Sequence, residues 1–245
     1  MKIRSNRGFT LVEMAIVMFI MTLALGTGLT LLSAQQDQRK VEDTASRLND
    51  AREALIGFVL AYGRLPCPAD PTIVSGTTGA GLETLTCTTS TSTGGVVPWA
   101  TLGISETDAW GRRLTYQVTN NWADSTDGTG MASCSVTVGV SFQLCSSANM
   151  NILSVVGGVN LASNIPAVIV SHGINGLGAY LPSGQRILPV PAATTNEGEN
   201  TNIDGNFVSR PLTSENETGG YFDDQVIWLS PNILFNRMVQ AGKLP

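Results

Sequence analysis

The feature that most limits what this chain can fold into is an apolar run of 24 residues, Phe9 to Leu32, with a single charged side chain, Glu13. About 20 apolar residues in a helix match the hydrocarbon core of a bilayer, so the run is long enough to span a membrane. A charge at the centre of such a helix costs roughly 2.5 to 3.5 kcal/mol, and one near its start costs less. A role for the Glu13 charge is therefore expected.

Charge is unevenly placed along the chain. The first eight residues carry Lys2, Arg4 and Arg7 and no acid, so a net charge of −5 for the whole leaves −5 − 3 = −8 for the remainder. Basic flanks stay on the cytoplasmic side of a membrane, so we expect the amino terminus to stay in the cytoplasm and the acidic body to cross. Nucleic-acid binding is not expected, because phosphate contacts need Lys and Arg.

The order of the amino-terminal segments differs from that of a secretory signal. Such a signal has a shorter apolar stretch followed by a small residue at the cleavage site. Here the small residue, Gly8, precedes the apolar run and directly follows Arg7. Cleavage at Gly8 would keep the apolar helix as the new amino terminus. The alternative is an uncleaved signal anchor with an incidental acid.

Helical periodicity continues beyond the apolar run. Apolar side chains recur at spacings of three and four from Val41 to Tyr62, with Arg52 as the one polar interruption. We predict one long helix in which residues 9–32 form a transmembrane and assembly segment and residues 33–63 an amphipathic continuation. The prolines that follow Gly63 end it.

The remainder, residues 64–245, has the composition of a β-rich exported globular region. It is rich in Gly, Thr and Ser, and β-branched runs predict strands at residues 112–118, 134–144 and 165–173. Residues 231–245 predict a short terminal helix.

Four cysteines suit two disulfides in an oxidising compartment. Three pairings are possible. We favour sequential pairing, Cys67 with Cys87 and Cys134 with Cys145, because each pair closes a short loop. Zinc is disfavoured, because the chain has one histidine and no CxxC spacing.

Enzymatic activity is not expected. His172 follows Ser171 directly, and adjacent residues on a strand point to opposite faces, so they cannot easily act as nucleophile and base. No GxSxG, phosphate-loop or HExxH spacing is present. His172 is interpreted as a residue that flanks a turn.

The segment "RGFTLVEMAIV" resembles the amino-terminal signature of type IV prepilins and of the pseudopilins of type II secretion. The resemblance implies that a prepilin peptidase cuts between Gly8 and Phe9, that Phe9 becomes N-methylated, and that Glu13 pairs with the terminal amine of a neighbouring subunit during filament assembly.

The same resemblance implies a fold, partners and a location. The fold class is α+β, with a long amino-terminal helix, its first half membrane-spanning, packed on an antiparallel β-sheet. The partners are other pilin or pseudopilin subunits, the prepilin peptidase and an inner-membrane assembly platform. The chain would cross the inner membrane once, with a cytoplasmic amino terminus, and then enter a periplasmic or extracellular filament.

Three segments of the body, "DAWGRRLTYQV", "SHGINGLGAY" and "FDDQVIW", also resemble pseudopilin segments. In the major pseudopilins the latter two regions help hold calcium, which binds six to eight oxygen ligands. The resemblance implies a possible calcium site at Asn175, Asp204, Asp223 and Asp224. The alternative is a solvated acidic loop with a turn at Asn175.

Two functional hypotheses follow. The first is a structural subunit of a type IV pilus or type II secretion pseudopilus. The second is a minor or tip pilin that binds a surface or ligand, in adhesion or DNA uptake. The long body, and Thr30 near the place where many pilins carry a helix proline, favour a minor or accessory subunit.

Overall fold

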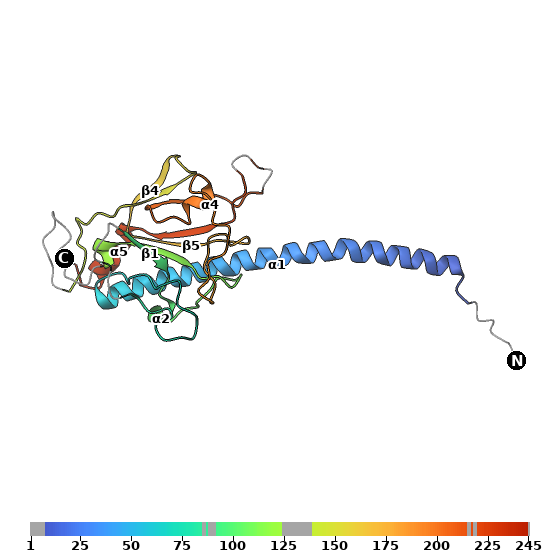
Figure 1. The fold of residues 1–245 in the computed structure, drawn as a ribbon, viewed down its shortest axis with the longest axis horizontal. Helices are drawn as coiled ribbons and strands as arrows, with labels where there is room; N and C mark the ends of the chain where they lie inside the picture. The colour runs from blue at the N-terminus through green and yellow to red at the C-terminus, as the bar shows by residue number, and fades with distance from the viewer. Residues whose placement is uncertain are drawn as a thin grey trace. The chain divides into compact units, whose positions relative to one another are not determined.

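The computed structural model describes residues 8–84, 87, 92–123, 139–214, 217 and 220–244, with the side chains of residues 24–34 left out. The chain divides into two compact units, residues 1–41 and 42–245. One helix, α1 (Leu11–Tyr62), contributes to both (Figure 1).

The helix α1 has the extent that its apolar periodicity predicts. It ends at Gly63, whose φ of 72° lies in the left-handed region and whose N–H donates to the Val59 carbonyl at 2.8 Å. In the part of the chain that the structure describes, no helix has the length and apolar character needed to cross a membrane.

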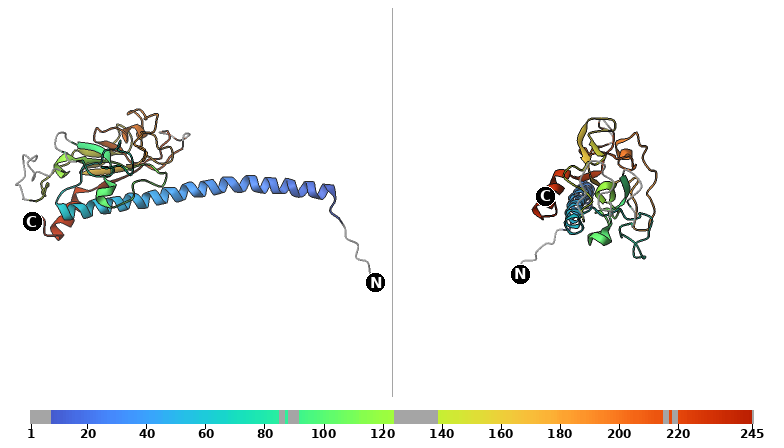
Figure 2. Two further views of the ribbon diagram at one scale, coloured as in Figure 1. Left: turned by 60° about the horizontal axis from the view of Figure 1, so that its bottom comes forward. Right: turned by 90° about the vertical axis from the view of Figure 1, so that its left-hand side faces the viewer.

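The second unit is built on a four-stranded antiparallel sheet with the order β1-β2-β5-β7. Its strands are β1 (Ser92–Val96), β2 (Thr115–Thr119), β5 (Ala167–Ser171) and β7 (Gln225–Leu229). One face packs on the carboxyl-terminal part of α1 (Figure 2). The buried side chains there include Leu48, Leu55 and Val59 of the helix and Tyr116 and Ile169 of the sheet.

A second sheet covers part of the other face. It contains β4 (Asn160–Ile165), β3 (Met150–Leu153) and β6 (Asn206–Val208), in the order β4-β3-β6, with β6 parallel to β3. Ile152 and Phe207 pack there against Val168 and Val170 of β5. Because β5 is covered on both faces, all five of its residues are buried, which explains its continuous apolar sequence.

Within the described residues, four short helices complete the fold: α2 (Trp99–Leu102), α3 (Asn120–Ala123), α4 (Asn196–Glu199) and α5 (Pro231–Gln240). The helix α5 is the predicted terminal helix, and it buries Leu234 and Met238 in the core around α1. The predicted α+β fold, an amino-terminal helix packed on an antiparallel sheet, is confirmed.

Two local expectations are wrong. Residues 139–144, the described part of the predicted strand 134–144, form turns and irregular backbone, and Phe142 stacks on Trp122 with ring centroids 4.4 Å apart. On α1 the buried stripe is rotated, so that Thr44 and Ala51 face the core while Tyr62 is 64% exposed.

Candidate functional site

The predicted processing bond, between Gly8 and Phe9, lies in irregular backbone just before α1. Gly8, Phe9 and Thr10 are exposed and not helical, and a Cβ placed on Gly8 would meet nothing within 4 Å. Phe9 is 81% exposed. A peptidase needs accessible backbone outside regular secondary structure, and the bond between Gly8 and Phe9 lies in such a segment. Residues 1–7 of the expected leader lie outside the described residues.

Thr10 and Glu13 form a reciprocal cap at this helix start. The Thr10 N–H and hydroxyl each donate to a Glu13 carboxylate oxygen at 3.2 Å, and the Glu13 N–H donates to the Thr10 hydroxyl at 3.3 Å. This is a capping box, in which two unpaired N–H groups of the first turn are satisfied. In the single chain Glu13 therefore compensates the positive end of its own helix.

The described apolar side chains near the start of α1 are uncovered. Their exposed fractions run from 45% at Val17 to 91% at Leu11. An apolar surface of this kind marks a place where lipid or protein packs.

A buried acidic cluster lies in the second unit, where the four-stranded sheet ends. Asp223 and Asp224 directly precede β7, and His172 and Asn175 belong to the turn that follows β5. Glu197 comes from α4, whose first turn is capped by the side chain of Thr195. Glu197, Asp223 and Asp224 each offer a carboxylate oxygen, and these oxygens lie within 4.8 Å of one another.

The carboxylate of Asp223 is only partly satisfied, whereas both oxygens of Glu197 accept hydrogen bonds. Asp223 Oδ2 accepts hydrogen bonds from the Asn175 N–H at 2.7 Å and the Tyr221 hydroxyl at 3.0 Å. Asp223 Oδ1 is buried and has no hydrogen-bond partner among the described residues. The Asn175 side-chain amide donates to both oxygens of Glu197 at 2.9 and 3.0 Å.

Burial and mutual repulsion raise the proton affinity of this cluster. Burial raises the pKa of Glu197 to about 7, helped by the nearby charges of Asp224 and Asp223 and opposed by the Asn175 hydrogen bonds. Burial also raises the pKa of Asp224, although its contacts with His172 and Asn200 favour the charged form. The cluster therefore favours either a proton or a cation at neutral pH.

The geometry fits a calcium ion. Oxygens that each lie 2.3 to 2.6 Å from one Ca²⁺ are at most about 5 Å apart, and the three carboxylate oxygens meet that limit. Of the predicted ligands, Asn175, Asp223 and Asp224 come together. Asp204 does not join this group; it is exposed and bonds Asn202 and Asn206 in its own loop.

Glu197 takes the place expected of Asp204, and sequence reasoning missed it. Its four-residue helix has no periodic signal, and only the threonine cap three residues before Gly198 hinted at a helix start.

His172 flanks the turn that follows β5, as expected, and its side chain is buried beside Asp224. It is 1% exposed, its Nε2 lies 2.8 Å from the Thr115 hydroxyl, and its Nδ1 lies 3.7 Å from Asp224 Oδ1. Thr115 and His172 line a cavity of about 90 Å³, which is room for about three water molecules. The side chains of Thr115, His172 and Asp224 come from β2, the turn after β5 and the entry to β7, so their contacts join three parts of the sheet.

The "DAWG" segment forms a turn, with Asp108 buried, that fastens α1 to the sheet. Asp108 accepts hydrogen bonds from the N–H groups of Trp110 and Arg112, both at 2.9 Å, and from the Ser171 hydroxyl at 2.7 Å. Arg47 of α1 donates to the Asp108 carbonyl at 2.9 Å. The motif is thus explained by packing.

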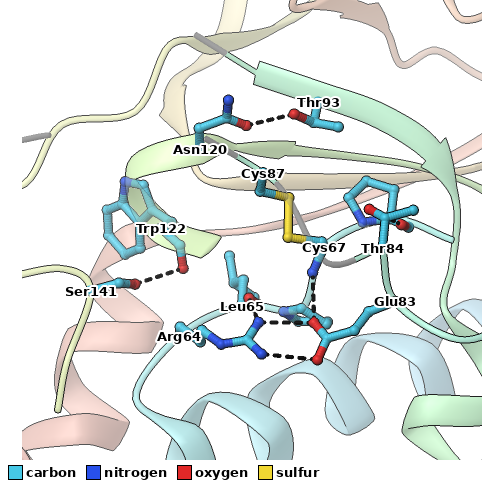
Figure 3. The surroundings of a disulfide bond; sticks show 12 residues. Arg64, Leu65, Cys67, Glu83, Thr84, Cys87, Thr93, Asn120, Trp122 and Ser141 are labelled. Carbon is cyan, nitrogen blue, oxygen red and sulfur yellow. Dashed lines mark hydrogen bonds and ion pairs between the residues drawn. A yellow bond between two sulfur atoms is a disulfide. The ribbon is translucent and has the colours of Figure 1, made fainter. Parts of the chain in front are cut away.

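The disulfide between Cys67 and Cys87 fastens the segment that leaves α1 (Figure 3). Beside it, Arg64 and Glu83 form a bidentate ion pair in which both N–O distances are 2.9 Å. The Cys67 N–H donates to the Glu83 carboxylate at 3.1 Å. This is the first of the two expected pairings. Cys145 is disulfide-bonded, and Cys134 lies outside the described residues, so the second pairing stays a prediction.

Comparison with known proteins places the amino terminus in a defined class. A family model for the prokaryotic N-terminal methylation motif matches residues 3–29. The chain is therefore consistent with a type IV pilin-like or pseudopilin prepilin, and its α+β architecture is consistent with the type IV pilin fold. No curated protein and no solved structure was found to match the chain.

Proposed function

We propose that this chain is a structural subunit of a type IV pilus or a type II secretion pseudopilus, that a prepilin peptidase cleaves it after Gly8, and that Phe9 is then N-methylated. The observation that carries the proposal is the methylation motif at residues 3–29, joined to a helix that begins two residues beyond Phe9. The exposed backbone at Gly8 supports cleavage there.

Glu13 sets the register of assembly in this proposal. In the single chain its carboxylate is held by Thr10 in contacts of 3.2 Å, which are long for hydrogen bonds. In the filament, the methylated amine of an adjacent subunit's Phe9 replaces Thr10 as the partner of the Glu13 carboxylate and offers it a full positive charge. Because both charged groups lose water, the pair specifies alignment more than it adds net stability.

The apolar helix serves two stages of assembly. Residues 9–32 hold the processed subunit in the inner membrane until an assembly platform extracts it. In the filament the exposed side chains between Leu11 and Leu23 then pack against other pilin or pseudopilin subunits.

The decisive experiment compares Glu13→Gln with Glu53→Gln, a matched change at an exposed acid of the same helix. We expect normal cleavage of both variants and normal incorporation of Glu53→Gln, but strongly reduced incorporation of Glu13→Gln into sheared filaments. Undiminished incorporation of Glu13→Gln would refute the register role.

We also propose that Glu197, Asp223 and Asp224 bind calcium, while the side-chain amide of the adjacent Asn175 positions Glu197 through its hydrogen bonds. The bound ion would balance, through its positive charge, the negative charges of the three clustered carboxylates. It would join α4 to the end of the four-stranded sheet, because Glu197 belongs to the helix and both aspartates lead into β7. Its role is structural.

A minor or tip position is the finer alternative, in which the body binds a surface or ligand. The second sheet, β4-β3-β6, favours it by adding surface beyond the sheet that packs on α1. Gold labelling of an epitope tag in sheared filaments tests this: label confined to filament ends supports it, and label along the shaft contradicts it.

A further inference from the structure

The turn that follows β5 contacts two of the three clustered carboxylates through Asn175. The Asn175 N–H donates to Asp223 Oδ2 at 2.7 Å, and the Asn175 side chain donates to both oxygens of Glu197. Glu197 and Asp223 lie 26 residues apart in the sequence, and Asn175 bonds them both. The conformation of this turn therefore helps to set how the two carboxylates stand relative to each other.

The turn is itself held by Arg112, which lies just before β2. The Arg112 guanidinium donates from Nη1 to the Gly173 carbonyl and from Nη2 to the Ile174 carbonyl, the second at 2.7 Å. The backbone N–H of Arg112 is fixed in turn by Asp108 Oδ1 at 2.9 Å. The planar fork of an arginine suits such paired acceptors, and here it fastens the two carbonyl groups directly before Asn175.

Two glycines allow this close packing. Gly173 and Gly176 have φ values of 52° and 61°, in the left-handed region that favours glycine. A Cβ on Gly176 would collide with the Arg112 side chain, and a Cβ on Gly173 would collide with Asp223. The turn therefore packs directly on both Arg112 and Asp223.

We propose that Arg112 is a positioning residue for calcium binding. By holding the turn, it places Asn175 so that Glu197 and Asp223 are oriented toward one ion. This inference rests on the calcium site proposed above. Groups that orient metal ligands typically change metal affinity by about 10- to 100-fold when they are removed.

The sign of the effect separates positioning from charge. Removing a positive charge from the body would by itself strengthen the binding of a cation. Loss of the guanidinium fork releases the turn and weakens binding. Arg112→Met, which keeps an unbranched side chain without the charge, is therefore expected to bind calcium about tenfold more weakly than the unmodified chain.

Arg47 offers a matched control. Its guanidinium also donates to two consecutive carbonyl groups, those of Thr107 and Asp108, both at 2.9 Å. Arg47→Met therefore loses the same charge and the same kind of hydrogen bonds, but none to the turn after β5. Isothermal titration calorimetry of the full-length chains in detergent micelles, below the melting temperature of each, should show that Arg47→Met binds calcium as tightly as the unmodified chain.

A second measurement needs no calcium. Hydrogen exchange followed by mass spectrometry in chelator reports the opening of the turn, because the N–H groups of Asn175 and Gly176 donate to Asp223 and to the His172 carbonyl. We expect the peptide that covers residues 172–177 to exchange faster in Arg112→Met than in the unmodified chain, and at an unchanged rate in Arg47→Met.

Three results would overturn the proposal. These are calcium binding by Arg112→Met as tight as that of the unmodified chain or tighter, equal weakening in Arg112→Met and Arg47→Met, and unchanged exchange of the turn in Arg112→Met. Absence of calcium binding by the unmodified chain would instead refute the calcium site itself. The exchange experiment would then still decide whether Arg112 holds the turn.

Discussion

Without calcium and near pH 8, Glu197→Gln is expected to stabilise the fold. The folded pKa of Glu197 is about 7 against an ordinary value of 4.5, so between these values the folded state binds more protons than the unfolded state. Stability therefore falls as pH rises from about 4.5 to about 7, and the loss is complete above that window. Glutamine cannot ionise, so the variant lacks this loss.

The size of the effect follows from the shift. A difference of about 2.5 pKa units at 1.36 kcal/mol each gives at most about 3 kcal/mol. The variant keeps one carbonyl oxygen where Asn175 now donates to two carboxylate oxygens, which costs about 1 kcal/mol. The net gain is therefore at most about 2 kcal/mol near pH 8, or up to roughly 4 to 8 °C in melting temperature for a domain of this size.

The assay is thermal unfolding followed by tryptophan fluorescence between pH 4 and 8.5, with a chelator and then with excess calcium. Excess calcium should raise the melting temperature of the unmodified chain and have a much smaller effect on Glu197→Gln. Asp50→Asn, at an exposed acid of α1, is the control. The reasoning fails if, in chelator, the unmodified chain and Glu197→Gln show the same pH dependence.

Three further changes test the contacts that hold the body together. Arg113→Met should cost about 3–5 kcal/mol in urea unfolding, because this fully buried guanidinium bonds Glu106 and two carbonyl groups, and an unchanged midpoint would contradict that role. Asp108→Ala should cost about 3 kcal/mol and Asp108→Asn about 1, because an amide oxygen still accepts the two N–H groups; equal losses would argue against it. Replacing both Cys67 and Cys87 by serine should cost about 3 kcal/mol in urea unfolding, as expected for a loop with a sequence separation of 20, and an unchanged midpoint would contradict a stabilising role for this disulfide.

The elements that sequence reasoning could find are those with a long or strongly apolar signal. The helix α1 has fifty-two residues and a glycine stop, and β5 is a continuous β-branched run, so both were predictable. The strands β3 and β6 have four and three residues, and β4 is exposed on both faces, so none of them shows an alternating apolar pattern. Their pairing depends on contacts between distant segments.

The candidate sites also differ in how far they can be predicted from the sequence, depending on whether their residues lie in one segment or in several distant ones. Gly8, Phe9 and Glu13 lie within one short stretch, so their arrangement is readable from the sequence. The acidic cluster joins α4 with the turn after β5 and the entry to β7, so it depends on tertiary structure. Asp223 and Asp224 were proposed as ligands because "FDDQVIW" resembles a pseudopilin segment, whereas Glu197 and Asp204 could be told apart only in three dimensions.

The central claim is tested most directly by mass spectrometry of the amino-terminal peptide of this chain in filaments sheared from native cells. The account predicts a peptide that begins at Phe9 and carries one N-methyl group. A chain that is missing from the sheared fraction and keeps Met1 in the membrane fraction would contradict it, and would instead indicate a signal-anchored exported domain.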